Sequence, residues 1–211
     1  MLNATGIFGG TFNPVHIGHL RTCVELREYL GLQAIHMIPS ARPPHRELPG
    51  VTAYHRLAML RLSTEGEPGL IADDRELRRE GLSYTIDTLR ELRGELGDDH
   101  SLIMCIGMDS LVNLASWYRW QELTEFAHLV VVARPGWQIP DSGPVALWLQ
   151  GKLRSNTDLL KSKPAGSVLI REMTLLPVSS TEVRKDLVAG RSLRYLVPDS
   201  VLEYIEQNKL Y

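Results

Sequence analysis

The sequence has few cysteines and lacks the glycine motifs of the commonest nucleotide-binding proteins. Cys23 and Cys105 are the only two cysteines among 211 residues. Both lie among apolar residues and form no CxxC pair, so we expect both thiols to be reduced and structural. Neither GxGxxG nor GxxxxGK[ST] occurs in the chain, which argues against NAD dehydrogenases and P-loop NTPases.

The sequence also lacks an excess of basic residues and a long apolar run. Lys and Arg number 23 against 25 Asp and Glu, a formal net charge of −2, and 44% of the residues are hydrophobic. This composition excludes disorder and argues against nucleic-acid or membrane-surface partners. No stretch of about 18 apolar residues could span a bilayer. The first residues lack the basic start and apolar run of a signal peptide, so we expect a cytoplasmic protein.

What the sequence has is an alternation of apolar strands and amphipathic helices, which predicts one α/β domain over residues 1–211. The expected fold is a single doubly wound, mainly parallel sheet with helices on both faces. Strands are predicted at residues 5–8, 34–39, 70–72, 101–106, 129–133, 168–170 and 175–178. Helices are predicted at residues 19–30 and 52–64, from Ser83 or Thr85 to Leu96, from residue 109 onward, and at 146–153, 181–189 and 198–207. Ligands of such sheets bind beyond the carboxyl ends of the strands.

The segment after the first strand combines glycines, a hydroxyl and two imidazoles at a predicted helix start. Gly9 and Gly10 let the backbone approach a ligand, and Thr11 offers a hydroxyl. His16 and His19 can give N–H donors, or positive charge when protonated, to phosphate oxygens beside the helix N-terminus. Two readings remain open beside this one: a plain turn, and a His-x-x-His metal site that lacks its other ligands.

Residues 9–19, GGTFNPVHIGH, resemble the signature of the HxGH nucleotidyltransferase superfamily. Three later segments, at residues 107–110, 117–120 and 179–184, resemble the bacterial nicotinate mononucleotide adenylyltransferase family in order and spacing. The similarity covers essentially the whole chain. It implies a Rossmann-like nucleotidyltransferase fold and transfer of AMP from ATP to nicotinate mononucleotide, which yields deamido-NAD and pyrophosphate in NAD biosynthesis.

The resemblance also implies the residues that bind ATP. His16, His19 and Arg184 would be catalytic through contacts with the phosphates, together with Mg²⁺ held mainly by phosphate oxygens and water. No protein metal site is expected. The other ATP contacts would be Gly9, Gly10, Thr11, Phe12, Gly107, Asp109, Ser180 and Thr181, with Asp109 on the ribose hydroxyls. Read by themselves, residues 179–182 fit a capping box, and Asp109 fits an acidic helix start.

For the second substrate, Trp117 and Tyr118 would stack on the pyridine ring and present backbone N–H groups to its carboxylate. Thr85 would hold the same carboxylate through its N–H at a helix start, which favours the acid over the amide. The remaining substrate contacts would be Ser40, His45, Arg46 and Arg134, the last three on the substrate phosphate. A core or surface aromatic cluster, a charged turn and a solvated loop are the simpler alternatives for these residues.

Three other functions are compatible with this sequence. Adenylyl transfer to nicotinamide mononucleotide or to phosphopantetheine uses the same superfamily motif, although phosphopantetheine enzymes are usually shorter. A non-catalytic nucleotide sensor would keep the fold, but both motif histidines and Arg184 are present. The sequence leaves the oligomeric state open, and a homo-oligomer is compatible with it.

Overall fold

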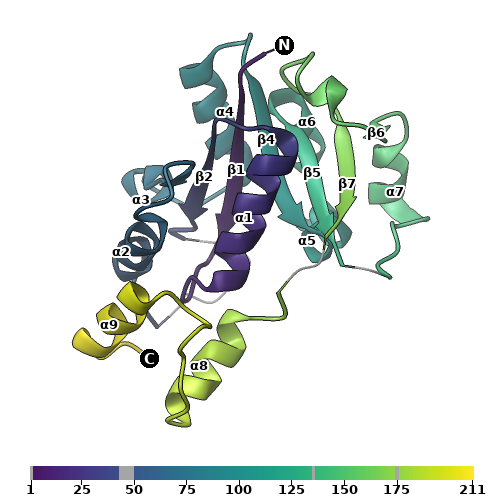
Figure 1. The fold of residues 1–211 in the computed structure, drawn as a ribbon. Helices are drawn as coiled ribbons and strands as arrows, with labels where there is room; N and C mark the ends of the chain where they lie inside the picture. Colours follow the sequence, from purple (N-terminus) through teal and green to yellow (C-terminus); the bar gives the residue numbers. More distant parts are fainter. Residues whose placement is uncertain (1, 43–49, 135, 174–175) are drawn as a thin grey trace. The chain divides into compact units, whose positions relative to one another are not determined.

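The computed structural model of the chain describes residues 2–42, 50–134, 136–173 and 176–211. It confirms a Rossmann-like α/β fold with a seven-stranded sheet in the order β3-β2-β1-β4-β5-β7-β6 (Figure 1). The strands are β1 (Ala4–Gly10), β2 (Ala34–Pro39), β3 (Leu70–Ala72), β4 (Ser101–Gly107), β5 (His128–Ala133), β6 (Leu153–Arg154) and β7 (Val168–Glu172). The longer helices are α1 (Ile17–Leu30), α2 (Ala53–Thr64), α4 (Thr85–Leu96), α7 (Gly143–Leu149), α8 (Ser180–Val188) and α9 (Asp199–Gln207).

The chain divides into two compact units. Unit 1 comprises Met1–Phe8, Leu30–Gln33 and Tyr84–Thr174, and unit 2 comprises Gly9–Tyr29, Ala34–Ser83 and Leu175–Tyr211. This division describes contacts and not folding, so the single domain predicted for residues 1–211 stays a prediction.

The centre of unit 1 is formed by β4 and β5, which are buried along almost their whole length. β4 pairs in parallel with β1 and β5, and β5 pairs in parallel with β7. Strands of this kind are continuous apolar runs because both of their faces are covered. Burial in β4 raises the pKa of the Cys105 thiol to about 12, and Cys23 on α1 in unit 2 is 0% exposed. Both cysteines are therefore buried core residues, as predicted.

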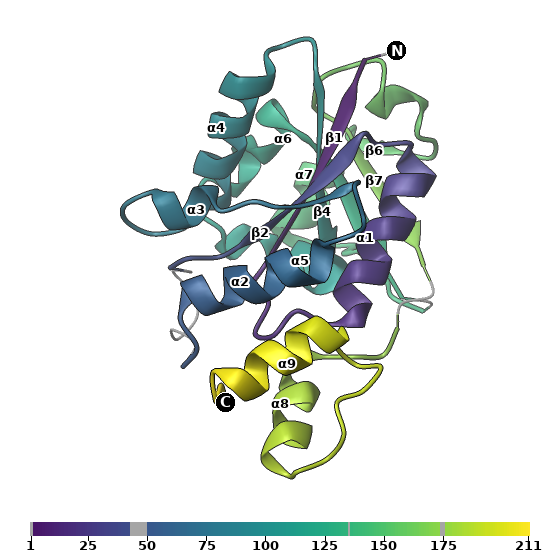
Figure 2. The ribbon, with the colours of Figure 1, turned by 60° about the vertical axis from the view of Figure 1, so that its left-hand side comes forward.

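Unit 2 contains the parallel pair β2 and β3 together with the helices around them. Thr52 caps α2 as predicted, since its side-chain oxygen accepts a hydrogen bond from the His55 N–H over 3.3 Å. The C-terminal helix α9 packs against α2, and both views show the two helices side by side (Figures 1 and 2). The end of the chain is thereby held next to the segment that follows β2.

One expected strand boundary and one expected strand are wrong. β1 continues through Gly9 and Gly10, so the turn begins only at Thr11. The predicted strand at residues 175–178 is absent from its described part, residues 176–178. Pro177 has no N–H to give a strand neighbour, and the Val178 N–H instead donates to the Leu176 carbonyl over 2.8 Å. This i to i+2 hydrogen bond closes a tight turn around Pro177.

The central part of the chain contains more short elements than the sequence predicts. The helix expected at 146–153 is α7, which starts and ends earlier, and its last predicted residue begins β6. The charged run at 73–80 contains a short helix, α3 (Arg75–Arg78). Further short helices are α5 (Met108–Val112), η1 (Leu114–Ser116), η2 (Trp120–Glu122), α6 (Leu123–Phe126) and η3 (Asp158–Leu160). Among the helices that the structure describes, none has both the length and the apolarity to cross a bilayer.

Candidate active site

The segment that follows β1 brings the two motif histidines into direct contact. The His16 and His19 rings are stacked with centroids 3.6 Å apart, and the backbone N–H of His16 donates to Nδ1 of the His19 ring over 3.3 Å. Because Nδ1 of His19 accepts this bond, a neutral His19 carries its proton on Nε2 and can donate it to a ligand. Gly18 permits the arrangement, since a Cβ there would lie only 3.1 Å from the His16 ring.

Both histidines are neutral at pH 7 in the protein without ligand. Burial lowers the pKa of His16 to about 4. Burial, with an added contribution from charge on His16, lowers the pKa of His19 to about 3. Of the two possibilities left open by the sequence, the structure therefore favours N–H donors over positive charge. A bound phosphate would shift both pKa values upward again, because an anion stabilises the charged imidazolium.

The glycines and Phe12 shape the start of the same loop. Phe12 is 1% exposed, has a left-handed φ of 49° and meets the His19 ring edge-on at 5.1 Å between centroids. A Cβ on Gly10 would lie 3.0 Å from the Phe12 ring, so Gly10 serves this packing. A Cβ on Gly9 would meet no atom of the described residues within 4 Å. The close approach of a ligand to Gly9 and Gly10 stays a prediction.

Helix α8 contacts this loop through two hydrogen bonds from its first two turns. Ser180 Oγ donates to the Pro14 carbonyl over 2.9 Å, and Arg184 Nη1 donates to the Asn13 carbonyl over 2.7 Å. Thr181 Oγ1 lies 3.4 Å from Arg184 Nη2. The structure therefore brings the predicted segment at residues 179–184 to the loop after β1, across sequence separations of 166 and 171 residues.

One of the two bonds of the capping box expected as the simpler reading of residues 179–182 is described, that from the Glu182 N–H to the Ser179 side chain. Ser179 Oγ accepts from the Glu182 N–H over 3.2 Å and donates to the Glu182 carboxylate over 2.9 Å. Ser179 is the N-cap of α8. The two readings are compatible, because Ser179 caps the helix while Ser180 and Arg184 contact the loop.

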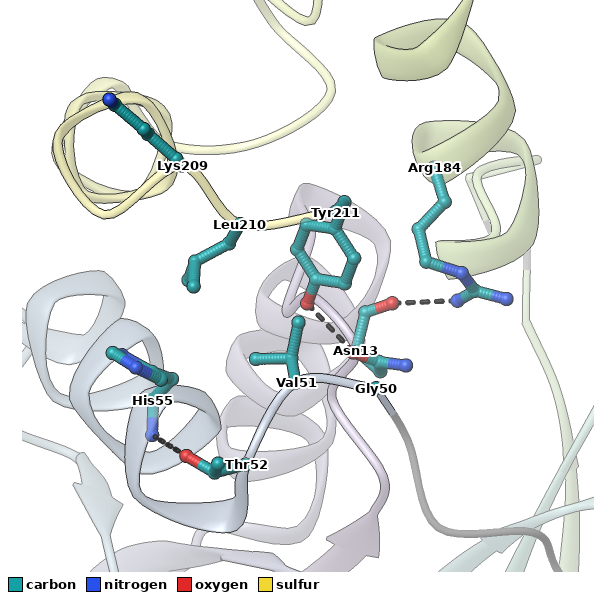
Figure 3. Close-up of a pocket in the computed structure, with 9 residues that line it drawn as sticks. All are labelled: Asn13, Gly50, Val51, Thr52, His55, Arg184, Lys209, Leu210 and Tyr211. Carbon is teal, nitrogen blue, oxygen red and sulfur yellow. Dashed lines mark hydrogen bonds between the residues drawn. The ribbon is translucent and has the colours of Figure 1, made fainter.

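A cavity of about 450 Å³ opens beside this junction (Figure 3). Figure 3 shows Asn13 between Arg184, which binds its carbonyl, and Tyr211, whose hydroxyl donates to Asn13 Oδ1 over 2.8 Å. Lys209 lies on the same C-terminal segment. The lining residues are Asn13, Gly50, Val51, Thr52, His55, Arg184, Lys209, Leu210 and Tyr211.

Ser40, the predicted substrate contact after β2, takes part in the site through its backbone. Its N–H donates to the Gly10 carbonyl over 2.9 Å, and its carbonyl accepts from Arg56 over 2.7 Å. These bonds join the segments that follow β1 and β2. The predicted contacts His45 and Arg46 lie outside the residues that the structure describes.

In unit 1, four predicted site residues lie at the expected ends of strands and helices. Gly107 ends β4, and Asp109 follows it, exposed, in the first turn of α5. Arg134 is exposed directly after β5. Thr85 is the first residue of α4, where backbone N–H groups lack partners within the helix.

The aromatic residues predicted for the second substrate are only partly arranged as expected. Tyr118 is 52% exposed, and its ring lies 4.6 Å from the Tyr84 ring between centroids. The N–H of Trp117 donates to the Leu114 carbonyl over 2.9 Å. That group is therefore engaged in a turn, and the prediction that Trp117 offers its N–H to a carboxylate stays a prediction. The prediction for the Tyr118 N–H stays open.

The sequence reasoning missed three residues that the structure places at the site: Asn13, Arg56 and Tyr211. Asn13 lies inside the motif at residues 9–19 but was given no role of its own, and Tyr211 acts through a distant partner that leaves no local signal. Arg56 did leave one. It stands three and four residues before Met59 and Leu60, which puts it on the buried face of α2, and it is 1% exposed.

A metal site at His16 and His19 would need at least one further protein ligand close to them. Among the residues that the structure describes, no group of three or more His, Cys, Asp or Glu side chains could hold a metal ion.

Comparison with known proteins identifies the family. The cytidylyltransferase-like family matches residues 7–186. A protein of Cellvibrio japonicus named as a probable nicotinate-nucleotide adenylyltransferase is 47% identical over 206 residues, which cover 98% of this chain and 97% of that protein. A protein of Aeromonas salmonicida with the same name is 46% identical, with 98% and 96% covered.

Solved structures show the same fold at low sequence identity. Nicotinic acid mononucleotide adenylyltransferase of Plasmodium falciparum, complexed with NaAD, superposes with a TM-score of 0.73 at 18% identity, covering 99% of this chain and 97% of that one. The same enzyme complexed with APC gives a TM-score of 0.68 at 16% identity, covering 99% and 97%. On the matched family and the full-length relatives together, the chain belongs to the nicotinate-nucleotide adenylyltransferases, within the cytidylyltransferase-like family.

Proposed function

We propose that this protein transfers AMP from ATP to nicotinate mononucleotide, releasing pyrophosphate and forming deamido-NAD. The observation that carries the proposal is the junction of loop and helix in unit 2. Ser180 and Arg184 bind the loop that presents the stacked pair His16 and His19. These are the side chains that the family motifs assign to the phosphates of ATP, and relatives of nearly equal length carry the name of this activity.

The reaction itself is a direct displacement at phosphorus. A phosphate oxygen of nicotinate mononucleotide attacks the α-phosphorus of ATP, and the bond from that phosphorus to the bridging oxygen of the β-phosphate breaks. The attacking phosphate is already ionised at neutral pH, since its second pKa is about 6. No general base or covalent intermediate is needed, so catalysis consists of positioning and of stabilising charge on the phosphates.

The residues of unit 2 supply hydrogen-bond donors for that charge. We assign contacts with the α- and β-phosphates to His16 and to the Nε2–H of His19. Arg184 approaches from α8. Its guanidinium has five N–H donors, and the bonds described engage its two terminal nitrogens once each, which leaves donors for phosphate oxygens. Thr181 offers its hydroxyl, and both Ser180 and Thr181 offer backbone N–H groups at the start of the same helix, while the Ser180 hydroxyl donates to the Pro14 carbonyl.

Mg²⁺ would accompany ATP into this site. Mg²⁺ in phosphoryl-transfer sites is held largely by substrate phosphates and water, and it would neutralise part of the triphosphate charge. His16, His19 and Arg184 would bind and orient the remaining phosphate oxygens.

For the nicotinate side, we retain the assignments made from the sequence, with one change. Thr85 and Tyr118 are proposed to hold the carboxylate through backbone N–H groups, while Trp117 contributes its ring alone. Asp109 is assigned to the ribose of ATP, and Arg134 to the substrate phosphate. As the sequence predicts, we place the enzyme in the cytoplasm.

Pyrophosphate release tests the proposal. Purified protein is given Mg-ATP with nicotinate mononucleotide, nicotinamide mononucleotide or phosphopantetheine in parallel. We expect the highest kcat/KM with nicotinate mononucleotide, because a carboxylate suits the N–H groups at the start of α4 better than an amide does. Equal rates with the acid and the amide, or a higher rate with phosphopantetheine, would refute the substrate assignment.

A further inference from the structure

Arg56 is a buried arginine that contacts both segments leading out of the sheet in unit 2. It lies on α2 and is 1% exposed. Its Nη1 donates to the Thr11 carbonyl over 2.6 Å, and its Nη2 donates to the Ser40 carbonyl over 2.7 Å. Thr11 follows β1 and Ser40 follows β2, so one guanidinium fixes the spacing of the two segments.

A backbone hydrogen bond also joins these two segments, and it is weaker than the bonds that the charged Arg56 donates. The Ser40 N–H donates to the Gly10 carbonyl over 2.9 Å, which is an ordinary bond between neutral groups. Hydrogen bonds from a charged donor are roughly twice as strong as neutral ones. Among the bonds described, Arg56 is therefore a charged side-chain link between the segment that presents His16 and His19 and the segment after β2.

A structural role explains the presence of a charge only in part. Taking a guanidinium out of water is unfavourable, and burial lowers the pKa of Arg56, a shift that the charge of Glu76 opposes without cancelling it. Its Nε is buried without a hydrogen-bond partner among the residues described. A neutral amide could donate to the two carbonyls without this penalty. What an amide lacks is positive charge, and the segment that Arg56 contacts is the one assigned to the triphosphate.

We propose that Arg56 is a positioning residue of the ATP site, which holds the segments after β1 and β2 at a fixed spacing and adds positive potential behind the phosphate-binding loop. The proposal rests on the function proposed above. Arg56 acts through the backbone of Thr11 and Ser40. Its loss would displace the loop that carries the two histidines and would weaken ATP binding as well as turnover.

The two contributions of Arg56 can be separated by substitution. Arg56→Lys keeps the charge but cannot donate to both carbonyls in the planar geometry of a guanidinium. Arg56→Met keeps most of the length and removes both charge and donors. Arg61→Met is the matched control, because Arg61 lies on the same helix and its side chain is 59% exposed in an ion pair with Asp74.

Each variant is assayed for Mg-ATP binding by calorimetry and for pyrophosphate release with nicotinate mononucleotide, after circular dichroism has confirmed folding. We expect kcat/KM for ATP to fall about 100-fold in Arg56→Met, on the scale of a misplaced binding loop. Arg56→Lys should lose about tenfold, the equivalent of one hydrogen bond to a charged group. The Kd for Mg-ATP should rise in the same order, and Arg61→Met should match the wild type.

Rescue by guanidinium distinguishes positioning from a loss of folded protein. In Arg56→Ala, added guanidinium chloride at non-denaturing concentration should restore part of the ATP affinity, while sodium chloride at equal ionic strength should not. A merely structural role predicts something else: a lower kcat in proportion to the unfolded fraction, with the Kd of the folded molecules unchanged.

Arg56→Lys decides the question if the larger changes prevent folding. A wild-type Kd for Mg-ATP in folded Arg56→Lys, or in folded Arg56→Met, would overturn the proposal. Failure of the proposed function gives a different result: the wild type would bind Mg-ATP without making the dinucleotide, and the Kd values of the variants would still judge the role of Arg56.

Discussion

The stacked rings of His16 and His19 place two imidazoles in contact, and both have pKa values far below neutral. Each is therefore available as an N–H donor at pH 7 in the protein without ligand. A transition state that gathers charge on phosphate oxygens is stabilised by donors fixed in place beforehand. At the scale of single residues, the proposed function would thus depend on fixed donors, with Arg184 as the charged group among them.

Removal of the His19 ring should affect turnover much more than folding. In His19→Ala, pyrophosphate release should fall by about 100-fold or more, the scale expected for a lost transition-state donor. Steady-state assays with saturating substrates measure this, and circular dichroism checks the fold. His19→Asn should retain more activity than His19→Ala, because its amide still donates an N–H. Wild-type turnover in folded His19→Ala would contradict the assignment.

The depressed pKa of His16 predicts a loss of stability in acid. The unfolded chain, with a His pKa near 6.5, binds more protons than the folded protein, whose His16 has a pKa of about 4. The contribution of neutral His16 to the free energy of unfolding is therefore fully present above about pH 6.5. It decreases as the pH falls toward 4, by up to about 1.4 kcal/mol per pH unit.

Urea unfolding of the wild type and of His16→Gln, near neutral pH and near pH 5, measures this slope. Other histidines titrate in both proteins, so the difference between the two curves isolates His16. We expect His16→Gln to lose less stability on acidification than the wild type does. Parallel curves would show that His16 does not titrate below its unfolded value.

The sequence could predict which residues lie together where each belongs to a local motif. His16, His19, Ser180 and Arg184 belong to this kind. The structure adds residues defined by distant partners: Arg56 bonds a carbonyl 45 residues away, and Tyr211 bonds one side chain 198 residues away. No local pattern encodes such pairs. Trp117 shows the reverse case, because a turn with Leu114 engages the N–H that the motif seemed to offer.

At the scale of elements, prediction succeeded where periodicity was strong. β4 and β5 are uninterrupted apolar runs, and α4 has both its apolar stripe and Gly97 at a left-handed φ of 78° to end it. Prediction was incomplete on either side of β5, at residues 113–126 and 143–160, where helices of three to seven residues are too short to show a period. It failed at Pro177, where an apolar run forms a turn.

The segment after α9 is joined to the loop after β1 by a side-chain hydrogen bond. The Tyr211 hydroxyl donates to Asn13 Oδ1, and burial raises the pKa of Tyr211 above its usual value. Tyr211→Phe should lower the free energy of unfolding by about 1 kcal/mol, the net value of a typical hydrogen bond. Urea denaturation measures the change. Tyr195→Phe, at a position 84% exposed, should have no effect, and an equal loss in both variants would contradict the role of Tyr211.

At the scale of the whole molecule, a net charge of −2 is compatible with an enzyme that handles phosphates. The cationic and donor groups of unit 2 gather at one loop, where Arg56 lies behind it and Arg184 beside it. A local concentration of donors is sufficient, because such groups act over short distances in a partly dry site. The overall charge predicted the absence of polyanionic partners and gave no information about the site.

The expected single domain predicts one unfolding transition for both units. All four tryptophans, at residues 117, 120, 137 and 148, belong to unit 1, so tryptophan fluorescence follows that unit alone. Far-UV circular dichroism follows the helices of both. In urea, we expect the two signals to change with the same midpoint. Distinct midpoints would show that unit 1 and unit 2 unfold separately.

The central claim is direct transfer of AMP from ATP to nicotinate mononucleotide, and radiolabel placement tests it most directly. The protein is incubated with Mg²⁺, nicotinate mononucleotide and ATP labelled either at the α- or at the γ-phosphorus, and the products are separated by chromatography. The account predicts α-label in deamido-NAD and γ-label in pyrophosphate, in equal amounts. Recovery of the α-label in ADP or AMP, with no labelled dinucleotide, would contradict it.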